Sequence, residues 1–328
     1  MKSLCLICKE PSKLTLEHII PQSIGGRLQA KIYCKTCNEA IGHELDDELA
    51  EQFGWVGTLL NIKRARGKTR PYDVKDIKSG TTLVFDGKTL SRKKPIVEIS
   101  SADGKNLDFA DITARSEKEL KEICTSIQKR YKLFGDMENF KDVHPGPTDA
   151  DKEMTIDNAL LRRAAAKIAY GLLCVKLPKD MILSSTFDAV RKYIKNDEEK
   201  SLAHANFVHT HFMTDHVRPL HKIHATLNRR EKLIVGFVSL FGMFRFTVLI
   251  AEGFQSLLEW PGLVYTYDPV RGAEIIGKES FRAPQLTKEN VLRPKQSKEF
   301  VGAELNSGMK VIETYVTKFK LISGEISS

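Results

Sequence analysis

The spacing of apolar residues in the first 60 positions predicts two short strands followed by a helix. An apolar run over 14–20 ends at Pro21, and a second short strand is expected at 31–33. Apolar residues then recur every four positions over 38–53, which is the spacing of an amphipathic helix. We treat residues 1–60 as the first domain.

The pattern changes to short strands over 73–114. Two Asp-Gly pairs, Asp86-Gly87 and Asp103-Gly104, predict hairpin turns there. A helix is expected over 116–133, because Ser116 followed by Glu119 forms a capping box. The stretch 134–155 has few apolar residues and predicts a long connection.

The last part of the chain is predicted to be helical first and then β. Ala159–Val175 is an Ala-rich, mostly buried helix, and a second helix over 186–194 has Ser184 or Ser185 as its candidate cap. The predicted strands are FVHTHFM (207–213), LHKIHATL (220–227) and a β-branched run over 233–252 that forms one or two buried strands. A helix is predicted over 309–321. The fold class is therefore α+β. We expect a larger domain of unassigned fold over 73–328, with 134–156 as a candidate point of subdivision, that recognises a target or regulates the first domain.

Composition excludes wholesale disorder and fibrous classes. The chain has 328 residues, of which 41% are hydrophobic and 28% are charged. The longest apolar stretch, 234–251, is interrupted by Arg245, and the N-terminus lacks a signal-peptide core, so we expect no membrane span and a cytoplasmic protein. A net charge of +9 permits an anionic partner such as DNA.

The most basic window follows the first domain, at 61–72. It contains five cations and no acidic residue: Lys63, Arg64, Arg66, Lys68 and Arg70. These side chains could neutralise backbone phosphates of a nucleic acid, or the window could be a solvated linker. Both interpretations remain open on the sequence.

Four of the six cysteines form two C-x2-C pairs. Cys5 and Cys8 make the first pair, Cys34 and Cys37 make the second, and 25 residues separate the two pairs. Two such turns can supply four thiolates to one tetrahedral Zn2+, and a site without a spare ligand position is structural. Cys124 and Cys174 stand alone in apolar patterns, so we expect them in the core.

The residues around these pairs carry a resemblance to a known family. Glu17-His18-Ile19-Ile20-Pro21 and Gly25-Gly26 lie between the pairs, and Asn38 directly follows the second pair. This layout resembles the zinc-bearing branch of the HNH endonuclease family over about residues 1–55. The resemblance implies a ββα-metal fold, His18 as general base, and Glu17 and Asn38 as ligands of a catalytic Mg2+ or Mn2+.

The sequence departs from the family pattern at several positions. The acid before the histidine is usually Asp, whereas here it is Glu17, and Gln29 stands where the family has its middle Asn. His43 could be a substitute metal ligand or a phosphate contact, or a partly exposed helix residue that pairs with Glu39 or Asp47. Adjacent strand residues face opposite ways, so Glu17 and His18 need a bend to address one phosphate.

Histidines cluster in the C-terminal half. Six of the nine lie between 204 and 224: His204, His209, His211, His216, His221 and His224. If 207–213 is a strand, His209 and His211 share one face. This cluster has three alternative interpretations: a second metal site, a nucleic-acid or nucleotide pocket, or histidines that belong to a strand or an interface.

The sequence therefore predicts a metal-dependent DNA endonuclease in restriction or anti-phage defence. Its partners would be DNA, a second copy of the chain, and a small-molecule or modified-base ligand of the C-terminal domain. The alternatives are a non-catalytic, zinc-dependent nucleic-acid-binding module and a nuclease effector that a ligand triggers.

Overall fold

The computed structural model describes residues 3–62, 71–87, 89–114, 116–133, 150–151, 157–196, 198, 200–254, 262–276 and 284–322. The chain forms two compact units: one combines residues 1–69 with 155–328, and the other comprises residues 70–154. This division differs from the predicted one, because the N-terminal segment packs with the C-terminal region rather than forming a unit of its own. The structure confirms the α+β class.

The N-terminal segment has the predicted order of strands and helix. Strands β1 (Ser3–Leu4) and β2 (Pro11–Ser12) pair with each other, and β3 (Leu14–His18) pairs antiparallel with β4 (Gln29–Cys34). A short 3-10 turn (Gln22–Ile24) lies between β3 and β4. The helix is longer than predicted, because α1 (Lys35–Ile41), a π-helical turn (Gly42–Asp46) and α2 (Asp47–Leu59) follow one another without leaving the helical backbone region.

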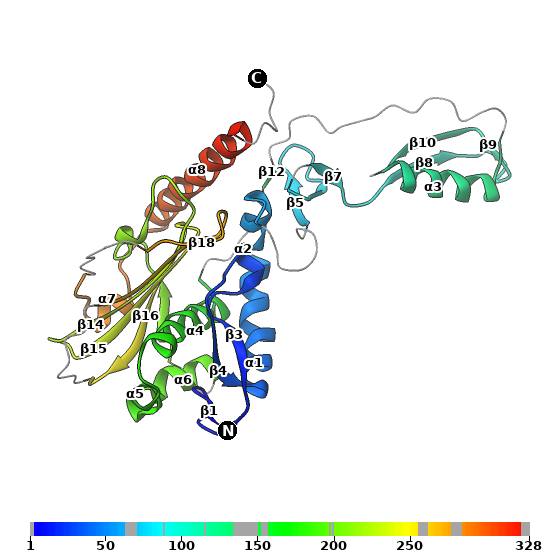
Figure 1. Cartoon of the computed structure of the whole chain (residues 1–328). Helices are drawn as coiled ribbons and strands as arrows, with labels where there is room; N and C mark the ends of the chain where they lie inside the picture. Colours follow the sequence, from blue (N-terminus) through cyan, green and yellow to red (C-terminus); the bar gives the residue numbers. More distant parts are fainter. Residues whose placement is uncertain are drawn as a thin grey trace. The chain divides into compact units, whose positions relative to one another are not determined.

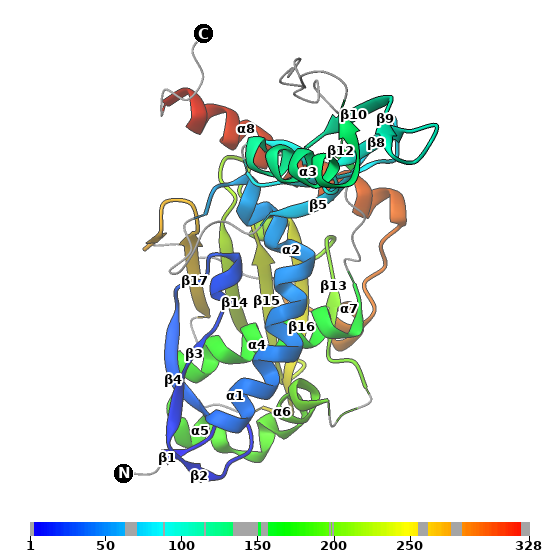
Figure 2. The ribbon, with the colours of Figure 1, turned by 90° about the vertical axis from the view of Figure 1, so that its right-hand side faces the viewer.

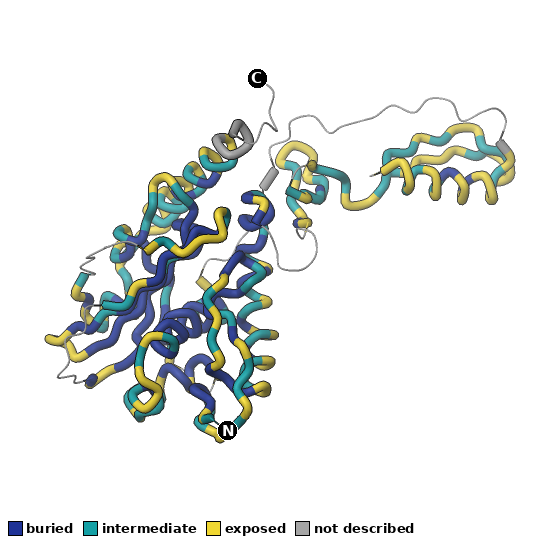
Figure 3. Tube along the Cα trace, viewed as in Figure 1, coloured by how far each residue is buried: buried dark blue, intermediate teal, exposed yellow. Residues whose placement is uncertain are grey.

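A six-stranded antiparallel sheet forms the core of the larger unit. Its order is β13-β16-β15-β14-β17-β18. The strands are β13 (Ala203–Ala205), β14 (His221–Asn228), β15 (Leu233–Leu240), β16 (Phe244–Glu252), β17 (Leu263–Asp268) and β18 (Ala273–Glu274). The apolar run 233–252 therefore forms two strands, joined at Phe241 and Gly242, whose φ angles are +58° and +69°. Both strands are buried along almost their whole length (Figure 3), so both faces of the sheet are covered here.

The prediction of a strand over 207–213 is wrong. Residues 206–210 form a turn that leads into a 3-10 helix (His211–Met213). Asn206 Oδ1 accepts a hydrogen bond from the His209 amide at 3.0 Å, and the Thr210 hydroxyl donates to the Asn206 carbonyl. These local side-chain bonds compete with strand pairing. His209 and His211 therefore do not share a strand face.

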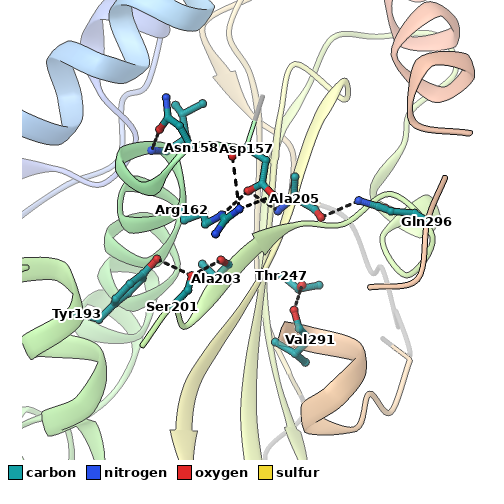
Figure 4. Close-up of polar contacts among 11 residues, drawn as sticks. Asp157, Asn158, Arg162, Tyr193, Ser201, Ala203, Ala205, Thr247, Val291 and Gln296 are labelled. Carbon is teal, nitrogen blue, oxygen red and sulfur yellow. Dashed lines mark hydrogen bonds and ion pairs between the residues drawn. The ribbon is translucent and has the colours of Figure 1, made fainter. Parts of the chain in front are cut away.

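Helix α4 (Ala159–Lys176) lies between the sheet and the N-terminal helix (Figures 1 and 2). It confirms the helix predicted over 159–175, and most of its residues are buried. At its start, Asp157 pairs with Arg162 at 2.6 Å and accepts from the Ala205 amide at 3.3 Å (Figure 4). Gln296 donates to the Ala205 carbonyl at 2.9 Å. Strand β13 is therefore bonded both to the start of α4 and to the segment 293–297.

The remaining helices of this unit are α5 (Lys179–Leu183), α6 (Asp188–Lys195), α7 (Lys288–Leu292) and α8 (Lys298–Ile322). A 3-10 turn (Ser185–Phe187) leads into α6, and neither Ser184 nor Ser185 caps it through a side chain. Helix α8 contains the segment predicted over 309–321. In the described part of the chain, no helix combines the length and the apolar character needed to cross a bilayer.

The second unit contains the short strands and the helix predicted over 73–133. Its strands are β5 (Tyr72–Asp76), β6 (Thr82–Phe85), β7 (Leu90–Arg92), β8 (Ile96–Ser100), β9 (Asn106–Leu107), β10 (Phe109–Thr113), β11 (Lys132–Leu133) and β12 (Ala150–Asp151). The β6–β7 and β8–β10 pairs are antiparallel and enclose the two Asp-Gly turns. Helix α3 (Glu117–Arg130) begins at Ser116, whose hydroxyl accepts from the Glu119 amide at 3.2 Å. Most of the connection 134–155 lies outside the described residues.

Contacts from three directions hold the N-terminal segment against the rest of its unit. Phe53 of α2 stacks on Phe244 of β16 with ring centroids 4.0 Å apart. The Tyr170 hydroxyl of α4 donates to the Leu6 carbonyl at 2.7 Å. His221 of β14 bonds the Ile24 carbonyl at 2.8 Å. These groups are buried, so the segment and the sheet share one core.

Truncation of Phe53 tests this shared core. Phe53→Ala removes a fully buried ring from the contact with β16. We expect the free energy of unfolding to fall by about 3–5 kcal/mol in urea denaturation. Phe300→Ala, at a ring that is 38% exposed, is the control and should cost less than about 1 kcal/mol. Equal losses in the two variants would show that the segment packs independently.

Candidate metal centre and nuclease site

The four N-terminal cysteines converge on one point. The sulfur atoms of Cys5, Cys8, Cys34 and Cys37 all lie within 4.8 Å of one another. The first pair sits in the turn after β1, and the second sits where β4 ends and α1 begins. The backbone amide of Cys34 donates to Cys5 Sγ at 3.2 Å, and that of Cys37 donates to Cys34 Sγ at 3.4 Å. The sequence spacing therefore becomes a compact cluster.

This cluster fits Zn2+. A tetrahedral ion with Zn–S bonds of about 2.3 Å places its sulfur ligands roughly 3.8 Å apart. Cys8 Sγ and Cys34 Sγ are 3.9 Å apart. The four residues would hold a structural zinc that fixes the β3–β4 hairpin to α1.

Glu17 and His18 occupy opposite faces of β3, as strand geometry requires. The Glu17 side chain is 4% exposed and faces α4. His18 is half-buried and lies opposite Gln29 of β4, whose side-chain amide nitrogen is 2.6 Å from His18 Nε2. Burial, together with the nearby Lys167, lowers the pKa of His18 below its ordinary value. This shift favours the neutral imidazole, and Gln29 contacts the ring at Nε2.

Lys167 of α4 reaches into the nuclease segment. Its ammonium forms ion pairs with the carboxylates of Glu17 and Asp46, the latter at 2.7 Å, and donates to the His18 carbonyl at 3.1 Å. The Lys167 side chain is 1% exposed. Burial raises the pKa of Glu17 and of Asp46, while Lys167 opposes the rise in both. Burial alone would lower the pKa of Lys167, but Asp46 and Glu17 raise it above its ordinary value, so the ammonium stays charged.

The catalytic cation implied by the resemblance does not fit the residues as they are arranged. The buried Glu17 carboxylate already contacts the ammonium of Lys167. Asn38 does follow the zinc cluster on α1, but its amide nitrogen donates to Thr15 Oγ1 at 2.9 Å and to the Leu16 carbonyl at 3.1 Å. Among the described residues, the four cysteines are the one cluster of His, Cys, Asp and Glu side chains suited to a metal. The Glu17 carboxylate is therefore engaged by an ammonium rather than open to a divalent cation.

His43 lies away from this centre. Its side chain is 86% exposed, and its Nδ1 is 3.6 Å from the Asp47 carboxylate one turn further along the helix. This is the pairing with Asp47 that the helix pattern allowed. His43 is not a member of the cysteine cluster. The five cations of the basic window, 63–70, lie outside the described residues.

The C-terminal histidines do not form a metal cluster among the described residues. His221 and His224 are buried in β14, and burial lowers the pKa of each to about 4. His221 donates from Nε2 to the Ile24 carbonyl and accepts from the Phe241 amide at Nδ1, so both of its nitrogens are satisfied. The rings of His211 and His216 are 5.9 Å apart. The contacts of β14 support the interpretation as strand histidines.

An antiparallel hairpin, the helix that follows it and a four-cysteine cluster at their junction define a ββα unit, and the cluster is compatible with a structural zinc. Residues 5–54 match the family model described as HNH endonuclease, so this segment is an HNH endonuclease domain. The resemblance predicted over residues 1–55 is thereby confirmed. No curated protein and no solved structure matches the chain.

Sequence analysis missed Lys167 and Asp46. Lys167 lies among consecutive buried residues of an otherwise apolar helix segment, and a lone cation in such a run signals a buried partner. Asp46 lies on the predicted nuclease helix, eight positions after Asn38. Their pairing spans 121 positions of sequence, so no local spacing could identify it.

Loss of the cysteine cluster should remove zinc and destabilise the nuclease segment. We expect elemental analysis to find one zinc per wild-type chain and almost none in Cys34→Ser. The melting temperature of that variant should fall by about 10 °C or more, because metal binding contributes directly to folding. Cys124→Ser, at a cysteine outside the cluster, should retain the zinc. Full zinc content in Cys34→Ser would contradict the assignment.

Proposed function

We propose that the chain is a DNA endonuclease of the HNH type that hydrolyses phosphodiester bonds with His18 as general base. The observation that supports this most is the neutral, half-buried His18 ring held beside Gln29 within an HNH domain. A neutral imidazole can accept a proton from water near pH 7.

Gln29 gives His18 a defined orientation for this role. As placed, the Gln29 amide nitrogen donates to His18 Nε2, which leaves the ring proton on Nδ1. We propose the carboxamide turned by 180°, so that its oxygen accepts from His18 Nε2–H and the lone pair lies on Nδ1. Nδ1 is then the atom that takes a proton from the attacking water. Gln29 occupies the place of the family's middle Asn, and in this structure it contacts the His18 ring. Gln29 is thus a positioning residue.

Dependence on Mg2+ or Mn2+, with Glu17 and Asn38 as ligands, is the part of the proposal that rests on the family resemblance. Oxygen ligands of this kind suit either ion. The ion pair between Lys167 and Glu17 must open before the carboxylate can bind a cation.

DNA is the proposed substrate, and the five cations of the basic window would contact its backbone phosphates. Such contacts give affinity that falls with salt but do not select sequence. One HNH centre cuts one strand, so cleavage of both strands would require a homodimer or two successive events. We propose a cytoplasmic protein, because cysteine thiolates that bind zinc are typical of a reducing compartment. Its proposed role is restriction or anti-phage defence, and the C-terminal region would recognise a ligand or a modified base.

Plasmid cleavage tests the proposed base. We expect wild-type protein to nick supercoiled DNA in Mg2+ or Mn2+ but not in EDTA, and His18→Ala to be at least ~100-fold slower. His43→Ala is the matched control and should cleave at the wild-type rate, since His43 is exposed and contacts Asp47.

Two results would contradict the proposal. Equal cleavage by His18→Ala and wild type would exclude His18 as the base. Folded, zinc-loaded protein that binds DNA but never cuts it would favour the non-catalytic binding module.

A further inference from the structure

The ammonium of Lys167 has the oxygen surroundings that a bound cation would have. It contacts a carboxylate oxygen of Glu17, a carboxylate oxygen of Asp46 at 2.7 Å and the backbone carbonyl of His18 at 3.1 Å. Carboxylate and carbonyl oxygens are also the ligands that Mg2+ and Mn2+ prefer. An ammonium is a compact point charge and can occupy such a position.

Neighbouring contacts hold Lys167 in this place. One helical turn earlier on α4, Arg163 forms a two-point ion pair with Glu44, whose second contact is 2.8 Å. At the start of the helix, Asn158 donates to Glu48 at 2.7 Å. Three polar residues of α4 and its N-cap thus each contact an acidic residue within positions 44–48 of the nuclease helix.

The opposite face of α4 packs against the six-stranded sheet (Figure 2). The ammonium therefore comes from the region that the sequence assigned to target recognition or regulation. A change in how α4 lies on the sheet would alter the distance between Lys167 and Glu17.

We propose that Lys167 is an internal competitor that occupies the cation position beside Glu17 and keeps the nuclease centre in a low-affinity state for divalent metal. The inference rests on the proposed function, in which Glu17 is a cation ligand. A site that is open for only a fraction of the time has its apparent affinity reduced by that fraction. Divalent cation and Lys167 should exclude each other at Glu17.

Binding of Mn2+ alone tests this competition. Zinc-saturated, full-length protein is titrated with Mn2+, and free Mn2+ is followed by its electron paramagnetic resonance signal. We expect Lys167→Met to gain one site that binds at least tenfold more tightly than any site in the wild type. Lys176→Met, an exposed lysine of the same helix, is the matched control and should behave as the wild type.

A second pair of variants identifies the ligand. Glu17→Gln combined with Lys167→Met should abolish the gained site. In the native Lys167 background, Glu17→Gln should leave Mn2+ binding unchanged, and this arm stands even if Lys167→Met does not fold. Tight Mn2+ binding by the wild type that Glu17→Gln removes would overturn the proposal, as would equal affinities of wild type and Lys167→Met.

Cleavage and binding separate the two hypotheses. Absence of His18-dependent cleavage together with a tenfold gain in Lys167→Met rejects the proposed nuclease function and retains the competition at Glu17. His18-dependent cleavage together with unchanged Mn2+ affinity in Lys167→Met rejects the competition and retains the nuclease function.

Discussion

The buried ion pairs of Lys167 with Glu17 and Asp46 are the interaction on which the arrangement of the nuclease segment depends. The Lys167 ammonium and the Glu17 carboxylate are almost fully removed from water, and the Asp46 side chain is 23% exposed. Each buried charge would be costly without its partners. The same ammonium bonds the His18 carbonyl, so the backbone of the proposed base is fixed by α4. The position of this helix thus determines both the charge balance and the geometry of the centre.

Helix α4 can perform this role because one of its faces packs against the sheet and the other contacts the nuclease segment. Its small residues allow close approach: a Cβ on Gly171 would lie 3.0 Å from two side-chain carbons of Ile19, in the loop after β3. Tyr170 and Lys167 place polar atoms on the carbonyls of Leu6 and His18. The HNH segment is thus part of a core that it shares with the sheet.

Local signals predicted much of this structure. The C-x2-C spacing predicted the zinc cluster, and the four-residue periodicity predicted the nuclease helix, because both depend on residues close in sequence. The strand over 207–213 was predicted wrongly. The alternation of apolar residues does not reveal the side-chain hydrogen bonds of Asn206 and Thr210 that form a turn there. Lys167 and Asp46 required the tertiary fold, which joins α4 to a helix more than a hundred positions earlier.

The most direct measurement is a crystal structure of the zinc-loaded protein soaked in Mn2+, with anomalous scattering used to locate the ion. Wild type and Lys167→Met would be soaked at the same Mn2+ concentration, one that saturates the variant. The account predicts an Mn2+ peak beside Glu17 and Asp46 in the variant, and the Lys167 ammonium at that place in the wild type. An Mn2+ ion bound to Glu17 in the wild type while Lys167 still contacts both carboxylates would contradict it.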